Sequence, residues 1–240
     1  MRVRGEWPNP VALRKGWYRA TARPWNRSRP DAHLRLIRGS VGFLTEVTDL
    51  VLGFGATSVV SPPLLGGTQT VWRTAGFGSY TTLRLLRKAL DGLEEHHAAV
   101  RQLGDAAWAR VVAIDAAAFG DMWKAELPAL VEALRSTSTS TLLGVDDPAT
   151  GSLAGYAIVA CSGSTGYLQR IGVHPNLQGL GLGRSLTRAA HNWSLQRGAR
   201  TVILNTKPDN AAALALYESE GYTVMPDRLE LLRYPPATDR

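Results

Sequence analysis

The sequence predicts a mixed α/β fold in which three hairpin strands precede a strand–loop–helix–strand–helix–strand series. Two observations predict it. Apolar runs at 142–145, 153–161 and 167–173 are separated by short segments rich in Asp, Pro, Gly and Ser, as expected for hairpins. A glycine-rich loop at 178–183 then separates the third run from a helical segment that ends near Arg197.

Composition limits the class of protein. The chain has 240 residues, of which 45% are hydrophobic and 20% charged, so it can bury a core without disulfides. No apolar run reaches the 18 to 20 residues of a membrane span, and Met1–Pro10 lacks the apolar centre of a secretory signal. The single Cys161 leaves no disulfide and no thiolate pair for zinc. We therefore expect a cytoplasmic protein without metal and without membrane contact.

Charge is distributed unevenly along the chain. Residues 1–92 carry 14 Lys/Arg against 5 Asp/Glu, a net charge of +9, whereas residues 93–240 have a net charge of −2. This asymmetry indicates either two modules or a basic N-terminal arm for an anionic partner such as RNA. The simpler interpretation is that these arginines only keep a surface in contact with water and bind no partner.

The first half is predicted to contain few regular elements. Residues 1–30 are expected to be irregular, with one short strand at Trp17–Thr21. Apolar residues then recur with helical spacing between Gly42 and Phe54. The remaining expectations are strands at Thr57–Val60 and Tyr80–Leu86, a Pro/Gly loop at Ser61–Thr70, and a helical or linking segment at Lys88–Ala99.

The second half is more regular. Asp105 can cap a helix whose apolar stripe runs from Trp108 to Phe119, and a second helix is predicted at Lys124–Arg135. Ser136–Thr141 is expected to be its exit loop. After the glycine-rich loop and its helix, the pattern predicts a strand at Thr201–Thr206, a helix at Ala211–Ser219 and a strand near Leu229–Tyr234.

A weak internal repeat connects the two halves. Gly55-Ala56 before Val59-Val60 corresponds to Gly198-Ala199 before Val202-Ile203. In the same order and at similar spacing, 72–77 corresponds to 217–222 and 83–87 to 229–233. The agreement in order indicates a duplication.

The glycine-rich loop suits a pyrophosphate. Alternating glycines let several backbone N–H groups converge, and the first turn of the next helix adds free N–H groups and a positive dipole end. Arg184 adds a full charge. The Gly-x-Gly-x-Gly spacing matches neither the P-loop, which needs a following Lys, nor the dinucleotide fingerprint. A plain glycine-rich turn remains the alternative for this segment.

Several motifs together resemble the GNAT (GCN5-related) N-acetyltransferase family. Gln178, Gly181 and Gly183 match its Gln/Arg-x-x-Gly-x-Gly/Ala signature, and the segment from Asn210 to Glu218 with Gly221-Tyr222 also fits. In detail the motifs resemble the ribosomal-protein alanine N-acetyltransferase branch. The resemblance implies the GNAT fold, a mostly antiparallel central sheet flanked by helices, with a catalytic domain at residues 96–240.

The N-terminal half matches only the back end of such a domain. A single glycine, Gly39, precedes its helix, so this half is not expected to bind a cofactor. Residues 1–95 are thus predicted to be a degenerate, truncated GNAT-like half, as in tandem members of the family such as mycothiol synthase.

The resemblance also implies acetyl-CoA as acetyl donor. Its pyrophosphate would lie on the glycine-rich loop, its pantetheine would pair with the end of the preceding strand, and Asn210, which is also a good helix N-cap, would reach the cofactor. The implied cofactor-binding residues are Ile171, Gly172, Val173, Gln178, Gly179, Leu180, Gly181, Leu182, Gly183, Arg184 and Asn210.

Two residues are candidates for catalysis. Tyr217 occupies the position at which the family keeps a tyrosine that protonates the leaving thiolate, although a half-buried aromatic on a helix is the alternative. Asn205 stands where the related branch carries a glutamate base. An amide cannot accept a proton at neutral pH, so its presence favours an amine of low pKa such as a protein N-terminus. His174 is a further candidate base.

The expected function is acetyl transfer from acetyl-CoA to a primary amine of a protein N-terminus or of a small molecule, by direct attack in a ternary complex. Two alternatives stay open: a non-catalytic acetyl-CoA-binding regulatory module, prompted by Asn205, and an RNA- or ribosome-associated protein that uses its basic N-terminal arm.

Overall fold

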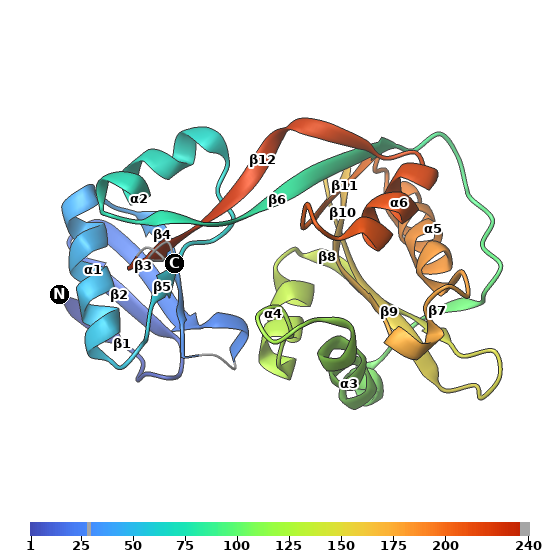
Figure 1. Cartoon of the computed structure of the whole chain (residues 1–240), viewed down its shortest axis with the longest axis horizontal. Coiled ribbons are helices and arrows are strands. Elements are labelled where there is room, and N and C mark those ends of the chain that lie inside the picture. The colour runs from blue at the N-terminus through green and yellow to red at the C-terminus, as the bar shows by residue number, and fades with distance from the viewer. Residues whose placement is uncertain (28–29, 236–240) are drawn as a thin grey trace. The chain divides into compact units, whose positions relative to one another are not determined.

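A computed structural model describes residues 1–27 and 30–235 as a mixed α/β protein, which confirms the predicted fold class (Figure 1). The chain forms two compact units. The first comprises residues 1–84 and 226–240, and the second residues 85–225. This division differs from the expected boundary after residue 95, because strands β6 (Gly78–Ala89) and β12 (Thr223–Tyr234) each contribute residues to both units. Within the described ranges, no helix is long and apolar enough to cross a membrane.

The sheet of the second unit combines a run of antiparallel strands with a parallel pair. Its strands follow the order β7-β8-β9-β10-β11-β6. Strands β7 to β10 pair antiparallel, whereas β10 and β11 are parallel. Their bounds are β7 (Val100–Gln102), β8 (Thr139–Asp146), β9 (Leu153–Ser162), β10 (Thr165–Val173) and β11 (Thr201–Thr206). The end of the expected exit loop, Thr139–Thr141, is part of β8.

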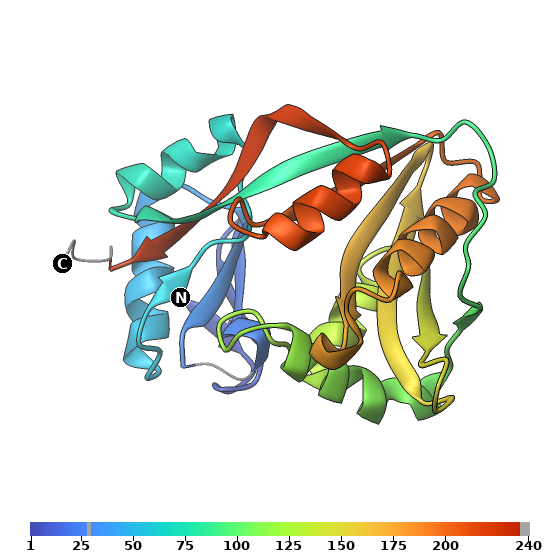
Figure 2. The ribbon, with the colours of Figure 1, turned by 45° about the vertical axis from the view of Figure 1, so that its right-hand side comes forward.

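Helices cover both faces of this sheet. Along β9, Ala157 and Val159 pack in the apolar cluster of α5 and α6, whereas Tyr156 and Ile158 pack in the cluster of α3 and α4. Figure 2 shows α5 and α6 together in front of the strands. The helices are η3 (Asp105–Ala107), α3 (Trp108–Ala118), α4 (Leu127–Arg135), η4 (Pro175–Leu177), α5 (Leu182–Leu195) and α6 (Ala211–Ser219).

The first unit contains strands where an irregular segment was expected. Strand β3 overlaps the predicted strand from Tyr18 to Thr21, but β1, β2 and β4 were missed. Inward positions of these strands hold residues such as Leu13, Ala20 and Leu34, which pack with Phe43 and Val47 of α1. The elements are β1 (Arg2–Arg4), β2 (Val11–Lys15), β3 (Tyr18–Pro24), η1 (Trp25–Arg27), β4 (Ala32–Arg38), α1 (Val41–Gly53), β5 (Val59–Val60), η2 (Gly66–Gln69) and α2 (Thr70–Thr74).

The two units share a topology. In the first, antiparallel β2, β3 and β4 are followed by α1 and by β5, which is parallel to β4. In the second, antiparallel β8, β9 and β10 are followed by α5 and by β11, which is parallel to β10. The first unit therefore corresponds to more than the back end of the second. It lacks counterparts of α3 and α4, since only residues 5–10 separate β1 from β2. The duplication itself stays a prediction.

Candidate active site

The glycine-rich loop forms a tight turn before α5. Gly179 and Gly181 have φ values of +83° and +75°, in the left-handed region that L side chains rarely adopt, and Gly181 is the N-cap of α5. A Cβ added at either position would meet no atom within 4 Å. Glycine is thus required here by the backbone conformation, and the space in front of the turn is open.

The start of α5 offers N–H groups to an anion. The first helical hydrogen bond runs from Ser185 N to Gly181 O, so the N–H groups of the preceding turn need other partners. The Arg184 guanidinium is already engaged, at 2.9 Å from Glu220 Oε1 and 3.1 Å from Ser219 Oγ. In this structure Arg184 therefore offers a phosphate its backbone N–H rather than a free charge.

Beside this turn, the two parallel strands part. Strands β10 and β11 pair at only three positions, from Thr165↔Thr201 to Tyr167↔Ile203, although β10 continues to Val173. Beyond Tyr167, β10 pairs with β9 alone. The predicted pantetheine-binding residues Ile171 to Val173 lie on this stretch, whose β11-facing edge is open to an added extended chain.

The predicted cofactor residues converge at this opening. Gln178 Nε2 donates to Val173 O at 3.2 Å, which ties the turn to the end of β10. A Cβ on Gly183 would lie 3.9 Å from Val173 Cγ2 and 3.5 Å from Leu216 Cδ2 of α6. The end of β10, the glycine turn and α6 are therefore immediate neighbours. The arrangement fits an extended chain that ends in a pyrophosphate.

Tyr217 is buried on α6 beside the end of β11. Its ring packs 5.5 Å from that of Tyr222, in the same cluster as Leu204. Burial raises the pKa of Tyr217 to about 12, so the hydroxyl stays protonated at neutral pH. Among residues 1–27 and 30–235, none gives this hydroxyl a hydrogen bond. A single unpaired donor is what a developing thiolate requires.

Asn205 lies on the opposite face of β11. It is exposed, and its neighbours Leu204 and Thr206 are buried on the face that Tyr217 covers. Asn210 caps α6, as predicted: its Oδ1 accepts from Ala213 N at 3.3 Å. The two candidate catalytic residues thus both lie near the end of β11, but on opposite faces of the sheet.

His174 has a structural role in the turn after β10. Its Nδ1 accepts a hydrogen bond from Asn176 N at 3.4 Å, and its backbone N–H donates to Ala154 O at 2.9 Å. It caps the short helix η4, and no hydrogen bond among the described residues joins it to Asn205 or Tyr217.

Sequence reasoning missed a buried ionic network beneath β10. The Arg170 guanidinium makes a two-point contact with Asp115 of α3, at 2.5 and 3.0 Å, and donates to Trp123 O at 2.7 Å. Tyr156 donates a short hydrogen bond to the same carboxylate. Burial alone would lower the pKa of Arg170, but its bonds to Asp115 outweigh burial and raise it. The network holds the loop between α3 and α4 against the sheet.

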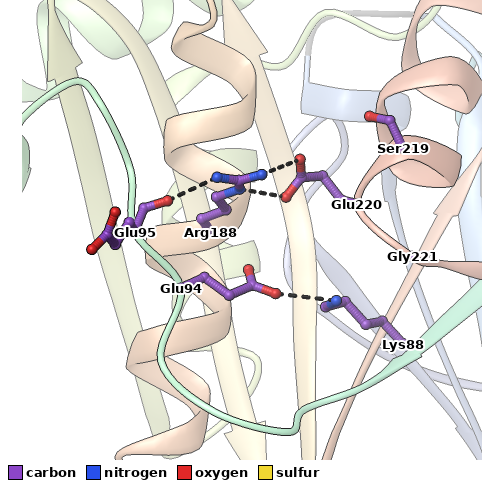
Figure 3. Close-up of a pocket in the computed structure, with 7 residues that line it drawn as sticks. All are labelled: Lys88, Glu94, Glu95, Arg188, Ser219, Glu220 and Gly221. Atoms are coloured by element: carbon purple, nitrogen blue, oxygen red, sulfur yellow. Dashed lines mark hydrogen bonds and ion pairs between the residues drawn. The ribbon is translucent and has the colours of Figure 1, made fainter.

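Sequence reasoning also missed the partners of the linking segment after β6. Asn192 of α5 exchanges two hydrogen bonds with the backbone of Glu94, at 2.7 and 2.8 Å. Arg188 donates to Glu95 O at 2.9 Å and holds Glu220 through two further bonds (Figure 3). These contacts fix the segment along α5. A lone Asn or Arg on a helix gives no sign of a partner nearly a hundred residues away.

Comparisons with known proteins agree with this geometry. Residues 108–222 match the acetyltransferase (GNAT) family. The chain is a member of the GNAT acetyltransferase family. The match covers α3 to Tyr222 and so contains the glycine turn, the parted strands and Tyr217.

Relatives of this member carry one recurring name. The chain is 32% identical over 187 residues to a mycothiol acetyltransferase of Renibacterium salmoninarum, a match that covers 68% of this chain and 54% of the relative. It is 51% identical over 53 residues, 22% of this chain and 18% of the relative, to a mycothiol acetyltransferase of Amycolatopsis mediterranei. The chain thus spans about half the length of the first relative.

The fold is shared with a tandem GNAT protein from the clavulanic acid biosynthesis pathway. That structure matches with a TM-score of 0.66 at 16% identity, over 93% of this chain and 81% of the other. At this identity the likeness shows the fold alone, and it confirms the predicted GNAT fold. The expected assignment to the alanine N-acetyltransferase branch stays a prediction.

Proposed function

We propose that the second unit transfers an acetyl group from acetyl-CoA to a primary amine of a small molecule. The observation that carries this proposal is the parting of β10 and β11 directly beside the glycine turn. An extended pantetheine would pair with Ile171 to Val173, and the pyrophosphate would lie on the N–H groups of residues 179–184. The thioester would then reach the end of the opening, where Tyr217 is located.

Tyr217 would act as a hydrogen-bond donor rather than as a full acid. A thiol has a pKa of about 8.5, so complete transfer from a tyrosine of pKa about 12 is uphill by roughly 5 kcal/mol. The hydroxyl would stabilise the thiolate that forms when the amine attacks the carbonyl and the C–S bond breaks. The proton lost by the attacking nitrogen leaves to solvent or to the thiolate.

The acceptor is proposed to be a small molecule with an amine of low pKa. The relatives named mycothiol acetyltransferase support a small molecule over a protein N-terminus. The exposed amide of Asn205 supplies no strong base, so an acceptor that is already partly neutral reacts best. An α-amino group, with a pKa near 8, is roughly a tenth neutral at pH 7, whereas a lysine-like amine is far less so.

The proposal is tested by release of free thiol from acetyl-CoA across a panel of amines. We expect turnover with α-amino groups of small molecules to exceed that with matched ε-amines and with peptide N-termini. Tight, saturable binding of acetyl-CoA without transfer to any amine would contradict it and would favour a regulatory module. Preference for peptide N-termini would overturn the small-molecule acceptor alone.

A further inference from the structure

The strand register of the first unit collects arginines on one face of its sheet. Arg2 pairs with Arg14, Arg14 with Arg19, and Arg19 with Arg38, so one row crosses four strands in register. Because side chains alternate along a strand, every second residue shares this face. Its members in β1 to β4 are Arg2, Arg4, Ala12, Arg14, Arg19, Thr21, Arg23, His33, Arg35 and, beyond a shift in the β3–β4 register, Arg38. We call this set the arginine face.

The opposite face of the same strands forms the core. Val11, Leu13 and Ala20 alternate with the arginine-face positions and pack against α1 in an apolar cluster. On the arginine face, the side chains of Arg14, Arg19 and Arg35 are exposed. The face is therefore a surface of the unit, set by the same alternation that builds its core.

No strand position of the arginine face in β1 to β4 holds an acidic residue, within the described part of the chain. Like charges directly opposite each other on neighbouring strands destabilise a sheet. A row of four arginines opposite one another therefore lowers the stability of the sheet, so the demands of folding do not explain it. The positive field is felt locally: burial, together with the charges of Arg23 and Arg35, lowers the pKa of His33 to about 3.

The positive charge of the whole chain lies in this unit. Its residues 1–84 and 226–240 carry 15 Lys/Arg against 7 Asp/Glu, a net charge of +8, whereas residues 85–225 have a net charge of −1. A unit with this excess attracts polyanions from solution.

We infer that the arginine face binds the phosphate backbone of single-stranded nucleic acid. Guanidinium groups make two-point hydrogen bonds to phosphate, and the neighbouring strands of a row, about 4.8 Å apart, offer them along an extended path. Trp17, 75% exposed at the turn beside the Arg14–Arg19 pair, supplies a ring on which a base can stack. This binding is independent of acetyl transfer.

Two other polyanions fit less well. Four strands span about 14 Å between the outer two, wider than the roughly 12 Å major groove of a duplex, so the sheet cannot enter it. An anionic membrane favours several large apolar side chains among the charges, whereas the uncharged strand positions of this face hold Ala12, Thr21 and the neutral His33, with Ile37 of β4 as one exposed apolar side chain beside them.

The test is fluorescence anisotropy of labelled 20-nucleotide single-stranded RNA and DNA with the full chain over a salt series. The variant Arg14→Gln/Arg19→Gln/Arg35→Gln removes three exposed charges of the arginine face. The matched control Arg110→Gln/Arg135→Gln/Arg200→Gln removes three exposed charges of the second unit. Thermal unfolding of both variants confirms that each is folded, and we expect the first to be as stable as the native chain or more so, because like-charge repulsion is relieved.

We expect the native chain to bind both single strands with an affinity that falls steeply as salt rises. The first variant should bind at least ~10-fold more weakly, with a salt slope reduced by about 2, and the control should change by less than ~2-fold. Equal losses in the two variants, or no binding at low salt, would overturn the inference. So would stronger binding to anionic vesicles, to an acidic polypeptide or to the duplex of the same sequence.

Discussion

The Nε2 atom of His191 lies 2.8 Å from the hydroxyl oxygen of Tyr222, and both side chains are buried. The other ring nitrogen, Nδ1, lies 2.5 Å from the Glu94 carboxylate. A carboxylate only accepts, so Nδ1 carries the proton and Nε2 accepts from the tyrosine hydroxyl. Since the Tyr222 ring packs on Tyr217, this chain of contacts connects the linking segment after β6 to the candidate catalytic residue.

The buried histidine predicts a loss of stability in mild acid. Burial outweighs the neighbouring Glu94 and lowers the pKa of His191, so the unfolded chain binds a proton before the folded one does. The unfolding free energy should therefore be independent of this group above about pH 7.5 and fall below pH 6.5, by at most about 1.4 kcal/mol per pH unit. Urea denaturation at pH 7.5, 6.5 and 5.5 measures it.

His33 must be controlled in the same experiment, because its pKa is also lowered and the sign is the same. We expect His191→Gln and His33→Gln each to flatten the pH dependence in part, and the double variant to flatten it further. An unchanged slope in His191→Gln would show that folding does not shift the pKa of this imidazole, and the prediction would be wrong.

The Tyr217 hydroxyl should matter for the transition state. We expect Tyr217→Phe to lower kcat at least 10-fold, about 1.4 kcal/mol, and to leave the KM for acetyl-CoA nearly unchanged, because the thiolate develops only as the C–S bond breaks. Steady-state kinetics of thiol release measures both constants.

Tyr222→Phe is the matched control for this variant. It removes the neighbouring hydroxyl, which is bound to His191, so we expect a loss of about 1–3 kcal/mol in stability with little change in kcat. If Tyr222→Phe lowers kcat as much as Tyr217→Phe does, the effect is one of packing, and the donor role of Tyr217 is wrong.

The glycine turn should be required for acetyl-CoA. We expect Gly181→Glu to lower affinity at least ~100-fold, because a carboxylate would stand in the open space before α5 and repel phosphate. Isothermal titration calorimetry with acetyl-CoA measures the affinity. Gly163→Glu, in the turn between β9 and β10, has a φ of +56° and equally open space, so it carries the same backbone strain. If both variants bind acetyl-CoA as the native chain does, the loop is not the pyrophosphate site.

Elements with a local signature could be predicted from the sequence. The helix at Val41–Gly53, the hairpins β8 to β10 and the helix Ala211–Ser219 have apolar periodicity bounded by Gly, Pro or a cap. The first-unit strands were missed because alanines fill many inward positions and arginines the outward ones. In the sequence such strands look like polar loops, because their inward residues are buried only when α1 packs against them.

The candidate site likewise contains some features that could be predicted from the sequence and others that could not. The glycine turn and the Asn210 cap depend on residues close in sequence, and the structure places them as predicted. The pairs Asp115–Arg170 and Glu94–His191 join residues 55 and 97 positions apart. Only the folded sheet brings these together, so no local pattern predicts them.

The buried Asp115–Arg170 pair should be costly to break. The Asp115 side chain has no exposure, so Asp115→Asn leaves an uncompensated guanidinium beneath the sheet, and we expect a loss of about 3–5 kcal/mol. Asp146→Asn, which breaks the largely exposed pair with Arg101, should cost at most about 1 kcal/mol. Urea denaturation of the two variants compares the losses. Similar small losses would mean that water reaches the buried pair.

A carboxylate at position 205 should widen the range of acceptors. Asn205 is exposed at the end of β11, so Asn205→Glu introduces a base without burying its charge. Near pH 7 we expect thiol release with a lysine-like amine to rise several-fold, because the new carboxylate can take the proton that such an amine retains. With an α-amino acceptor the rate should change less than ~2-fold, since roughly a tenth of it is already neutral. Asn205→Gln lengthens the side chain without adding a base, and it should leave both rates unchanged. Equal gains in Asn205→Glu and Asn205→Gln would assign the effect to side-chain length, and the argument that a missing base selects the acceptor would then fail.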